Sequence, residues 1–234
     1  MIKIAKFGGS SVADAEHFKK IKAIVDADPA RRFVVVSACG RRFKGDTKVT
    51  DLLYLVNAHV KYHVSCEELL EDIGQRYFDI ADELELTYPI REEFAAFAER
   101  ARSGDYSTEE LVSRGEYFTA RLMAEYLGLP FLDAATVVAF HHDGTLSMNR
   151  TSELVQEYGR AALLCPVSTA RRVRARSSCS TVVAAIFPAR SWPSAWVPTC
   201  TRTGPTSRAS ILPILALCPR LSPLRALPTR SCAN

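Results

Sequence analysis

Three short segments of the sequence combine residue types that could bind phosphate or a charged substrate. In the first, Lys6 is followed by Gly8, Gly9, Ser10 and Ser11 at the end of an apolar stretch. Glycines let backbone N–H groups approach phosphate oxygens, and an ammonium group can neutralise charge on a phosphoryl group in transfer. The segment is neither a Walker A loop nor a dinucleotide fingerprint. Its spacing also fits a plain strand-to-helix turn with a solvated lysine.

The second segment, Ser37-Ala38-Cys39-Gly40, follows a continuous apolar run. Ligands of open α/β sheets bind at the carboxyl ends of strands, so a parallel sheet would place Ser37 beside the first segment. A turn around a buried cysteine is the alternative interpretation. We interpret Cys39 as a small apolar residue, because nothing nearby marks it as an activated thiolate.

The third segment, residues 110–116, lies inside a helical pattern and has the sequence ELVSRGE. Ser113 and Glu116 share a helix face, and Gly115 indicates close approach by a ligand or by a neighbouring backbone. By its pattern alone, a solvated helix face is the favoured interpretation of Glu116. Thr50 and Asp51, before an apolar pair, have the types expected at a helix start.

The hydrophobic pattern predicts the elements that would position these segments. Ser11 and Asp14 suit the start of a helix, and a mostly β-branched run such as Phe33–Val36 is typical of a strand buried on both faces. Strands are predicted at 2–7, 33–36 and 131–138, and helices at roughly 48–62, 66–85, 90–102 and 108–127. Alternating strands and helices favour an α/β fold with a mainly parallel sheet.

Together these segments resemble the aspartate kinase branch of the amino acid kinase family. The matching motifs are KFGGSSVA at 6–13, VVVSACG at 34–40, KVTDLL at 48–53 and ELVSRGE at 110–116, in family order and at family-like spacing. The resemblance covers residues 1–160. It implies an incomplete three-layer α/β sandwich with a mainly parallel sheet, which holds the phosphate loop and the aspartate-binding lobe.

The resemblance also implies roles for particular residues. Lys6, Gly8, Gly9, Ser10 and Ser37 would bind the phosphates of ATP, with Lys6 stabilising the transition state. Thr50 and Glu116 would hold L-aspartate, Glu116 through the α-ammonium group. The implied reaction, with Mg²⁺ as a charge shield, phosphorylates the β-carboxylate of aspartate, the first step towards lysine, threonine and methionine. Such catalysis is mostly positioning and electrostatics. A homo-oligomer is a further expectation.

The composition changes abruptly near residue 160. Residues 1–160 contain all 26 acidic residues and have a net charge of −6, whereas residues 161–234 contain ten Arg and no Lys, Asp or Glu. The second part also holds nine of the twelve Pro and five of the seven Cys, without CxxC spacing or histidine. A basic tail can indicate nucleic-acid binding, but no sustained helix or strand period accompanies it. We therefore expect residues 161–234 to form an unstructured tail, with nucleic acid an improbable partner.

The tail is also explained as out-of-frame sequence. Aspartate kinases continue with VPGFYG, GGSD and WTDV segments, and CPVSTA at 165–170 can be written TGC CCG GTT TCT ACG GC, which reads VPGFYG when started one nucleotide earlier. TVVAAI at 181–186 similarly recovers DGGGSD, and TCTRTGPTS at 199–207 recovers DLYENWTDV. A frameshift near residue 160 would impair the kinase. A non-catalytic remnant that binds aspartate or an intact subunit is the alternative, and a nucleic-acid-binding protein is a third.

The sequence begins without a signal-peptide pattern, because Lys3 and Lys6 interrupt its first apolar stretch. The apolar runs at 181–187 and 211–218 are far shorter than the roughly 20 residues that span a bilayer. We expect a cytoplasmic protein without a membrane partner. His141, His142 and Asp143 are left without a metal role, because adjacent histidines point in different directions.

Overall fold

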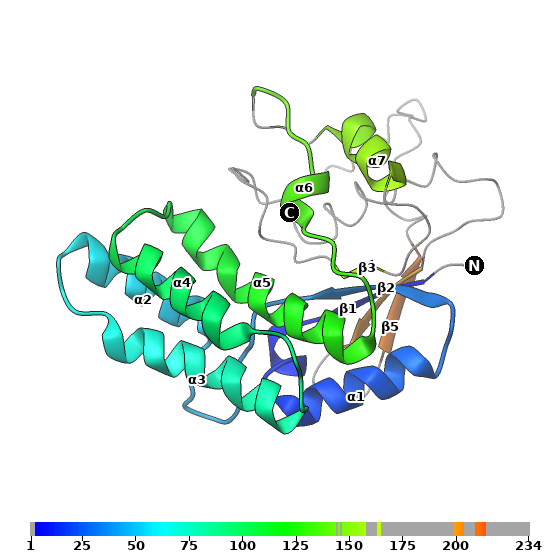
Figure 1. Cartoon of the computed structure of the whole chain (residues 1–234). Coiled ribbons are helices and arrows are strands. Elements are labelled where there is room, and N and C mark those ends of the chain that lie inside the picture. Colours follow the sequence, from blue (N-terminus) through cyan, green and yellow to red (C-terminus); the bar gives the residue numbers. More distant parts are fainter. Residues whose placement is uncertain are drawn as a thin grey trace, which may run out of the picture.

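A computed structural model describes residues 3–143, 145, 147–157, 163–164, 199–203 and 209–213 (Figure 1). A five-stranded sheet runs through it in the order β3-β2-β1-β4-β5. The strands are β1 (Lys3–Phe7), β2 (Arg31–Val36), β3 (Leu163–Leu164), β4 (Thr199–Thr203) and β5 (Ala209–Pro213). Pairing is parallel between β1 and β2, β1 and β4, and β2 and β3, whereas β5 runs antiparallel to β4. The predicted mainly parallel sheet is confirmed.

The strands of the sheet centre follow the predicted patterns. All four residues of 33–36 in β2 are buried, as expected for a strand covered on both faces. In β1, Ala5 and Phe7 are buried while Lys6 between them is half-buried. Because successive side chains of a strand point to opposite faces, Lys6 projects from the other face of the sheet.

Five helices follow the sequence pattern closely. Helix α1 (Ala15–Asp26) begins where the Asp14 carboxylate accepts a hydrogen bond from the His17 N–H at 3.0 Å. The next four are α2 (Val49–Lys61), α3 (Glu67–Glu83), α4 (Ile90–Arg102) and α5 (Thr108–Leu127). Helix α5 is capped by the Ser107 hydroxyl and stops at Gly128, whose φ of +64° is left-handed. The bounds of these four agree with the predicted ranges to within about two residues.

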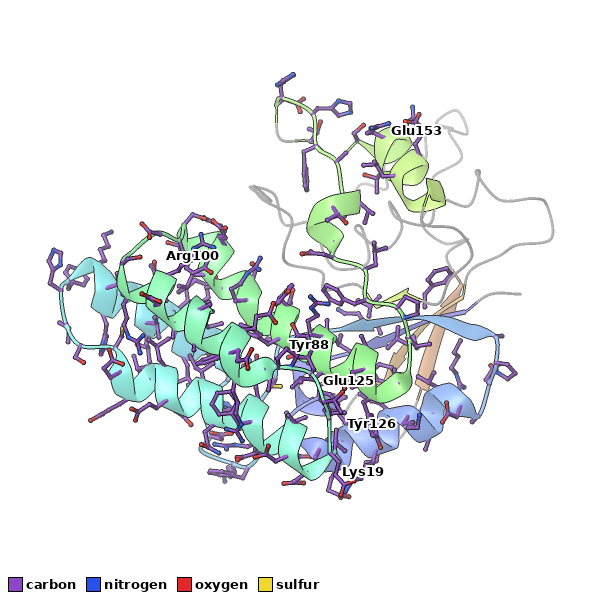
Figure 2. The ribbon with its side chains drawn as sticks, in the orientation of Figure 1. Lys19, Tyr88, Arg100, Glu125, Tyr126 and Glu153 are labelled. Carbon is purple, nitrogen blue, oxygen red and sulfur yellow. The ribbon has the colours of Figure 1, made fainter. Side chains whose placement is uncertain are left out.

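Helices α3, α4 and α5 are held together by aromatic packing. Rings of Tyr77, Phe94, Phe97 and Phe118 contact one another with centroids 5.4 to 6.5 Å apart. The loop between α3 and α4 is tied to the end of α5, because Glu125 accepts hydrogen bonds from the backbone N–H groups of residues 87 and 88 (Figure 2). These contacts join α3, α4 and α5, and α2 packs against α3 and α5 to complete one lobe.

The elements form three layers, with the sheet as the middle layer (Figure 1). Helix α1 lies on one side, whereas the short helices α6 (Ala134–Val137) and α7 (Met148–Glu157) lie on the other. The lobe of α2–α5 extends beyond the carboxyl ends of β1 and β2. No helix in the described ranges is long and apolar enough to cross a membrane.

One predicted strand is wrong. Residues 131–138 contain helix α6 in place of an extended segment. The Asp133 carbonyl accepts a hydrogen bond from the Thr136 N–H at 3.0 Å, and the Val138 N–H donates to the Ala134 carbonyl at 2.8 Å. Short apolar runs do not distinguish a strand from a buried helical turn by periodicity alone.

Strands β3, β4 and β5 come from the region expected to be an unstructured tail. In these short segments the backbones pair with one another or with β1 and β2. The edge position of β5 is compatible with Pro213, which has no N–H to donate. The segments 165–170 and 181–186, and with them Trp192 and Trp196, lie outside the described residues.

Candidate functional site

The loops that follow β1 and β2 lie directly against each other. The Ser37 N–H donates to the Phe7 carbonyl at 3.1 Å, and the Gly40 N–H donates to the Gly9 carbonyl at 2.9 Å. A Cβ on Gly40 would lie 2.5 Å from the Gly9 carbonyl carbon, so only glycine fits there without a shift. The structure thus brings the first two predicted segments together at one edge of the sheet.

The loop after β1 keeps open space beside it. Residues Gly9–Ser11 form a 3-10 turn, η1, in which the Ser11 N–H donates to the Gly8 carbonyl at 2.8 Å. A Cβ on Gly8 would meet no atom within 4 Å, and Ser10 is exposed. Half-buried Lys6 is the penultimate residue of β1, the strand that leads into this loop. A glycine loop with room around it and a lysine beside it can accept an anionic group.

The start of α2 is joined to the loop after β2. The Val49 N–H donates to the Cys39 carbonyl at 3.2 Å. Lys48 occupies the N-cap position without a side-chain cap, and Thr50 and Asp51 lie in the first turn, so they do not themselves cap the helix. The negative charge of Asp51 is stabilised by the positive end of the helix dipole. Thr50 is half-buried and lies next to the junction of the two loops.

Gly115 brings α5 onto the same junction. A Cβ on Gly115 would lie 3.0 Å from Leu53 Cδ1 and 3.1 Å from Ala38 Cβ. The close approach predicted for Gly115 is therefore to helix α2 and to the loop after β2. Glu116 is half-buried and lies next in the sequence to Gly115, the residue that makes this contact. All four predicted motifs meet where β1 and β2 end.

Buried hydrogen bonds fix the backbone around Gly115. Its carbonyl accepts from the Tyr77 hydroxyl at 2.8 Å and from Thr119 Oγ1 at 2.9 Å. Thr119 Oγ1 also lies 3.4 Å from Cys39 Sγ. Burial raises the pKa of the Cys39 thiol to about 11, which keeps it protonated near neutral pH. The interpretation of Cys39 as a small, inert core residue is confirmed by its burial.

An ionic cluster that sequence analysis missed anchors the loop between β2 and α2. Buried Arg76 of α3 reaches Asp46 Oδ1 with Nη2 at 3.0 Å and the Thr47 carbonyl with Nη1 at 2.6 Å. Asp46 also accepts hydrogen bonds from the Arg42 backbone N–H and Nε, and Asp72 contacts Arg76 at 3.1 Å. Burial alone would raise the pKa of Asp46, but the hydrogen bonds from Arg42 and the charges of Arg76 and Arg42 lower it to about 2.

A signal for Arg76 was present in the sequence. It lies on the face of α3 that carries Ile73, Tyr77 and Ile80, all of which are buried. A charged residue at an apolar position of a helix needs a partner, because an unpaired buried charge is costly. The partner could not be identified from local spacing, since Asp46 is contributed by a separate loop.

Other described features contribute nothing to this site. Among the described residues, no group of three or more His, Cys, Asp or Glu could hold a metal ion. Asp143 caps its own loop by accepting from the Thr145 N–H at 2.8 Å and from Thr145 Oγ1 at 2.6 Å. A surface hollow lined by Lys61, His63 and Glu109 lies at the end of α2 and the start of α5; it touches the fourth motif only at Leu111 and includes none of the predicted site residues.

Known proteins with a similar sequence or structure are aspartate kinases. No family model matches the chain. Aspartokinase 3 of Bacillus subtilis (strain 168) is 40% identical over 130 residues, which are 53% of this chain and 29% of that protein. The first part of this chain is related to the aspartate kinases. Its relatives are therefore phosphotransferases.

The solved structures agree with this relationship. Aspartate kinase of Clostridium acetobutylicum superimposes with a TM-score of 0.68 and 37% identity over 70% of this chain and 38% of that one. Aspartokinase III of E. coli, in complex with aspartate and ADP, gives a TM-score of 0.59 and 26% identity over 71% of this chain and 40% of that one. The chain thus spans well under half the length of the relatives it matches. The α/β fold is similar to that of part of these aspartate kinases.

Proposed function

We propose that the site binds L-aspartate and the phosphates of ATP, and that its reaction is phosphorylation of the aspartate β-carboxylate to 4-phospho-L-aspartate. The observation that carries the proposal is the meeting of four distant motifs at the carboxyl ends of β1 and β2, the edge at which α/β sheets bind ligands. The related E. coli enzyme was solved with aspartate and ADP, which supports the same pair of ligands here.

Each predicted residue has a chemical part in this proposal. Backbone N–H groups around Gly8, Gly9 and Ser10, with Ser37 from the adjoining loop, would bind phosphate oxygens. Lys6 would stabilise the negative charge that develops on the transferred phosphoryl group. Thr50 would donate a hydrogen bond to a substrate carboxylate, and Glu116 would pair with the α-ammonium group. These assignments rest on residue chemistry and on the family resemblance.

We propose that Mg²⁺ would bind mainly to the phosphate oxygens of the nucleotide. Magnesium in kinase sites is bound by substrate phosphates, waters and one or two carboxylates, so a three-residue protein cluster is not required. When bound, it would shield charge between the phosphate oxygens. A cytoplasmic location, self-association and a place in lysine biosynthesis are further parts of the proposal, supported by the family resemblance alone.

We also propose that residues 1–160 form the working part and that the chain beyond is out of frame. The loss of acidic residues beyond residue 160 and the recovery of three family segments at one offset support this division. The chain would then bind aspartate but transfer phosphate poorly. A non-catalytic aspartate-binding protein is the second candidate, because the described part contains both residues assigned to aspartate.

Titration calorimetry with L-aspartate tests the proposed site. Glu116→Gln should weaken binding by roughly 10- to 100-fold, the value of a charge-assisted hydrogen bond to an ammonium group. Glu109→Gln, an exposed substitution in the first turn of the same helix, is the matched control and should change affinity less than about 2-fold. Equal affinity of the two variants, or no binding by the unaltered chain, would overturn the proposal.

A further inference from the structure

Arg76 of α3 makes several polar contacts with the loop before α2. Arg76 is 2% exposed, and its guanidinium contacts Asp46, the Thr47 carbonyl and Asp72. Replacement of a buried ion pair by apolar residues of similar volume is often neutral or stabilising. Stability alone therefore does not explain why a charged pair is buried here, and the geometry that the pair imposes on the loop is a second effect.

The geometry imposed is that of the segment leading into α2. Two consecutive residues, Asp46 and Thr47, are held from the α3 side by Arg76, and the Thr47 N–H also donates to Asp46 Oδ1 at 3.0 Å. Two residues later, the Val49 N–H is held from the sheet side by the Cys39 carbonyl. The segment 46–49 is thus fixed at both ends, and Thr50 follows it directly.

We propose that Arg76 is a positioning residue for the aspartate site, acting by holding the 46–49 segment so that Thr50 faces the junction of the two loops. The inference rests on the proposed function, which gives Thr50 its role. A side chain on rigid support binds its ligand with less loss of conformational freedom, so release of the segment should weaken aspartate binding. Arg76 itself lies outside the set of residues proposed to touch aspartate.

Two measurements on the full chain test the inference. Amide hydrogen exchange by mass spectrometry, without ligand, reports on residues 41–50 and on α4 as an internal reference. Calorimetry reports the affinity for L-aspartate. The variants are Arg76→Met, Arg76→Lys and Asp46→Asn, with Arg91→Met as the matched control because Arg91 forms an exposed ion pair with Asp82 of α3.

Arg76→Met should speed exchange in residues 41–50 at least about 10-fold with α4 unchanged, and should weaken aspartate binding by about 10-fold or more. Arg76→Lys should recover part of the affinity, because a lysine reaches Asp46 but cannot also hold the Thr47 carbonyl in a fork. Asp46→Asn should resemble Arg76→Met, and Arg91→Met should resemble the unaltered chain.

The outcomes separate this inference from the proposed function. Failure of the unaltered chain to bind aspartate overturns the proposed function and, with it, the role of Thr50. Binding by the unaltered chain with undiminished affinity in Arg76→Met overturns the inference alone. Faster exchange throughout α4 as well as 41–50, or no rescue by a folded Arg76→Lys, makes Arg76 a general structural residue and also overturns it.

Discussion

Gly8 and Gly40 are both glycines of the loop junction, but different physical reasons explain them. Gly40 has no room for a side chain, because a Cβ would lie within 2.7 Å of three backbone atoms of Gly9 and Ser10. Gly8 has open space around it and an extended backbone that any residue can adopt. Gly40 is therefore required by packing, whereas packing leaves Gly8 free to vary, and its proposed role is to leave space for a ligand.

Alanine substitutions at these two positions should give opposite phenotypes. Gly40→Ala should destabilise the chain by about 2 kcal/mol or more, because two backbones must separate. Gly8→Ala should change the unfolding free energy by less than about 0.5 kcal/mol while reducing the affinity for ADP. Urea denaturation and nucleotide titration measure the two effects. A stable Gly40→Ala variant would contradict the close loop contact.

Asp46 should make stability depend on acid pH. Its pKa is lowered from 3.8 to about 2 in the folded chain, so its contribution is complete above pH 4 and is lost as pH falls from about 4 to 2. The shift corresponds to about 2 kcal/mol of unfolding free energy. Urea titrations at pH 5 and pH 2.5 should show a smaller loss for Asp46→Asn than for the unaltered chain. An identical loss in both proteins would refute the assignment.

At the scale of elements, α5 shows how local signals define a helix. The predicted range 108–127 equals the observed one, because the Ser107 cap, the apolar spacing and Gly128 all act within a few residues. The contacts of Gly115 with Leu53 and Ala38 are long-range, and the sequence predicted a close approach there without its partner. Local bounds were therefore predictable, whereas packing partners were not.

Loss of the α5 cap should destabilise the helical lobe. Ser107→Ala removes the hydroxyl that accepts from the Glu110 N–H at 3.2 Å, and should lower the unfolding free energy by about 1 kcal/mol. Ser65→Ala, an exposed serine between α2 and α3, is the control and should cost less. Thermal unfolding followed by circular dichroism compares the two. Equal melting temperatures would show that the cap contributes nothing.

The residues of the candidate site that belong to short motifs could be predicted from the sequence. Lys6, Gly8, Gly9, Ser10, Ser37, Thr50 and Glu116 were all selected from short patterns and from the resemblance, and the structure brings their segments together. The pairing of Arg76 with Asp46 was not predicted: the apolar face of α3 marks Arg76, but its partner comes from a separate loop that local spacing does not identify. The strand predicted at 131–138 failed because its apolar run fits a helical turn as well.

At the scale of the whole molecule, the strongest prediction concerns a chain in which the proposed frameshift near residue 160 is reversed. Insertion or deletion of one nucleotide near codon 160 should raise phosphoryl transfer to aspartate by orders of magnitude, because loss of a single preorganised electrostatic group typically costs 10²- to 10³-fold in rate. Acyl phosphate trapped with hydroxylamine measures the rate of both products. The control is Glu116→Gln in the restored chain, which should lower activity again. Comparable rates before and after restoration would show that residues 161–234 form a working domain.

The position of β1 in the sheet has a consequence for how the chain folds. β1 is the central strand of the sheet and pairs with β2 along one of its edges and with β4 along the other. Residues 3–7 and 199–203, which form β1 and β4, are nonetheless far apart in the sequence. Contacts between distant residues form slowly, since a long loop must close before the pairing repays its entropy. During synthesis on the ribosome, the edge of β1 that pairs with β4 therefore stays unpaired until residues 199–203 have been translated. An open strand edge is a template for aggregation, so chaperone capture of the nascent chain should be greatest in this interval.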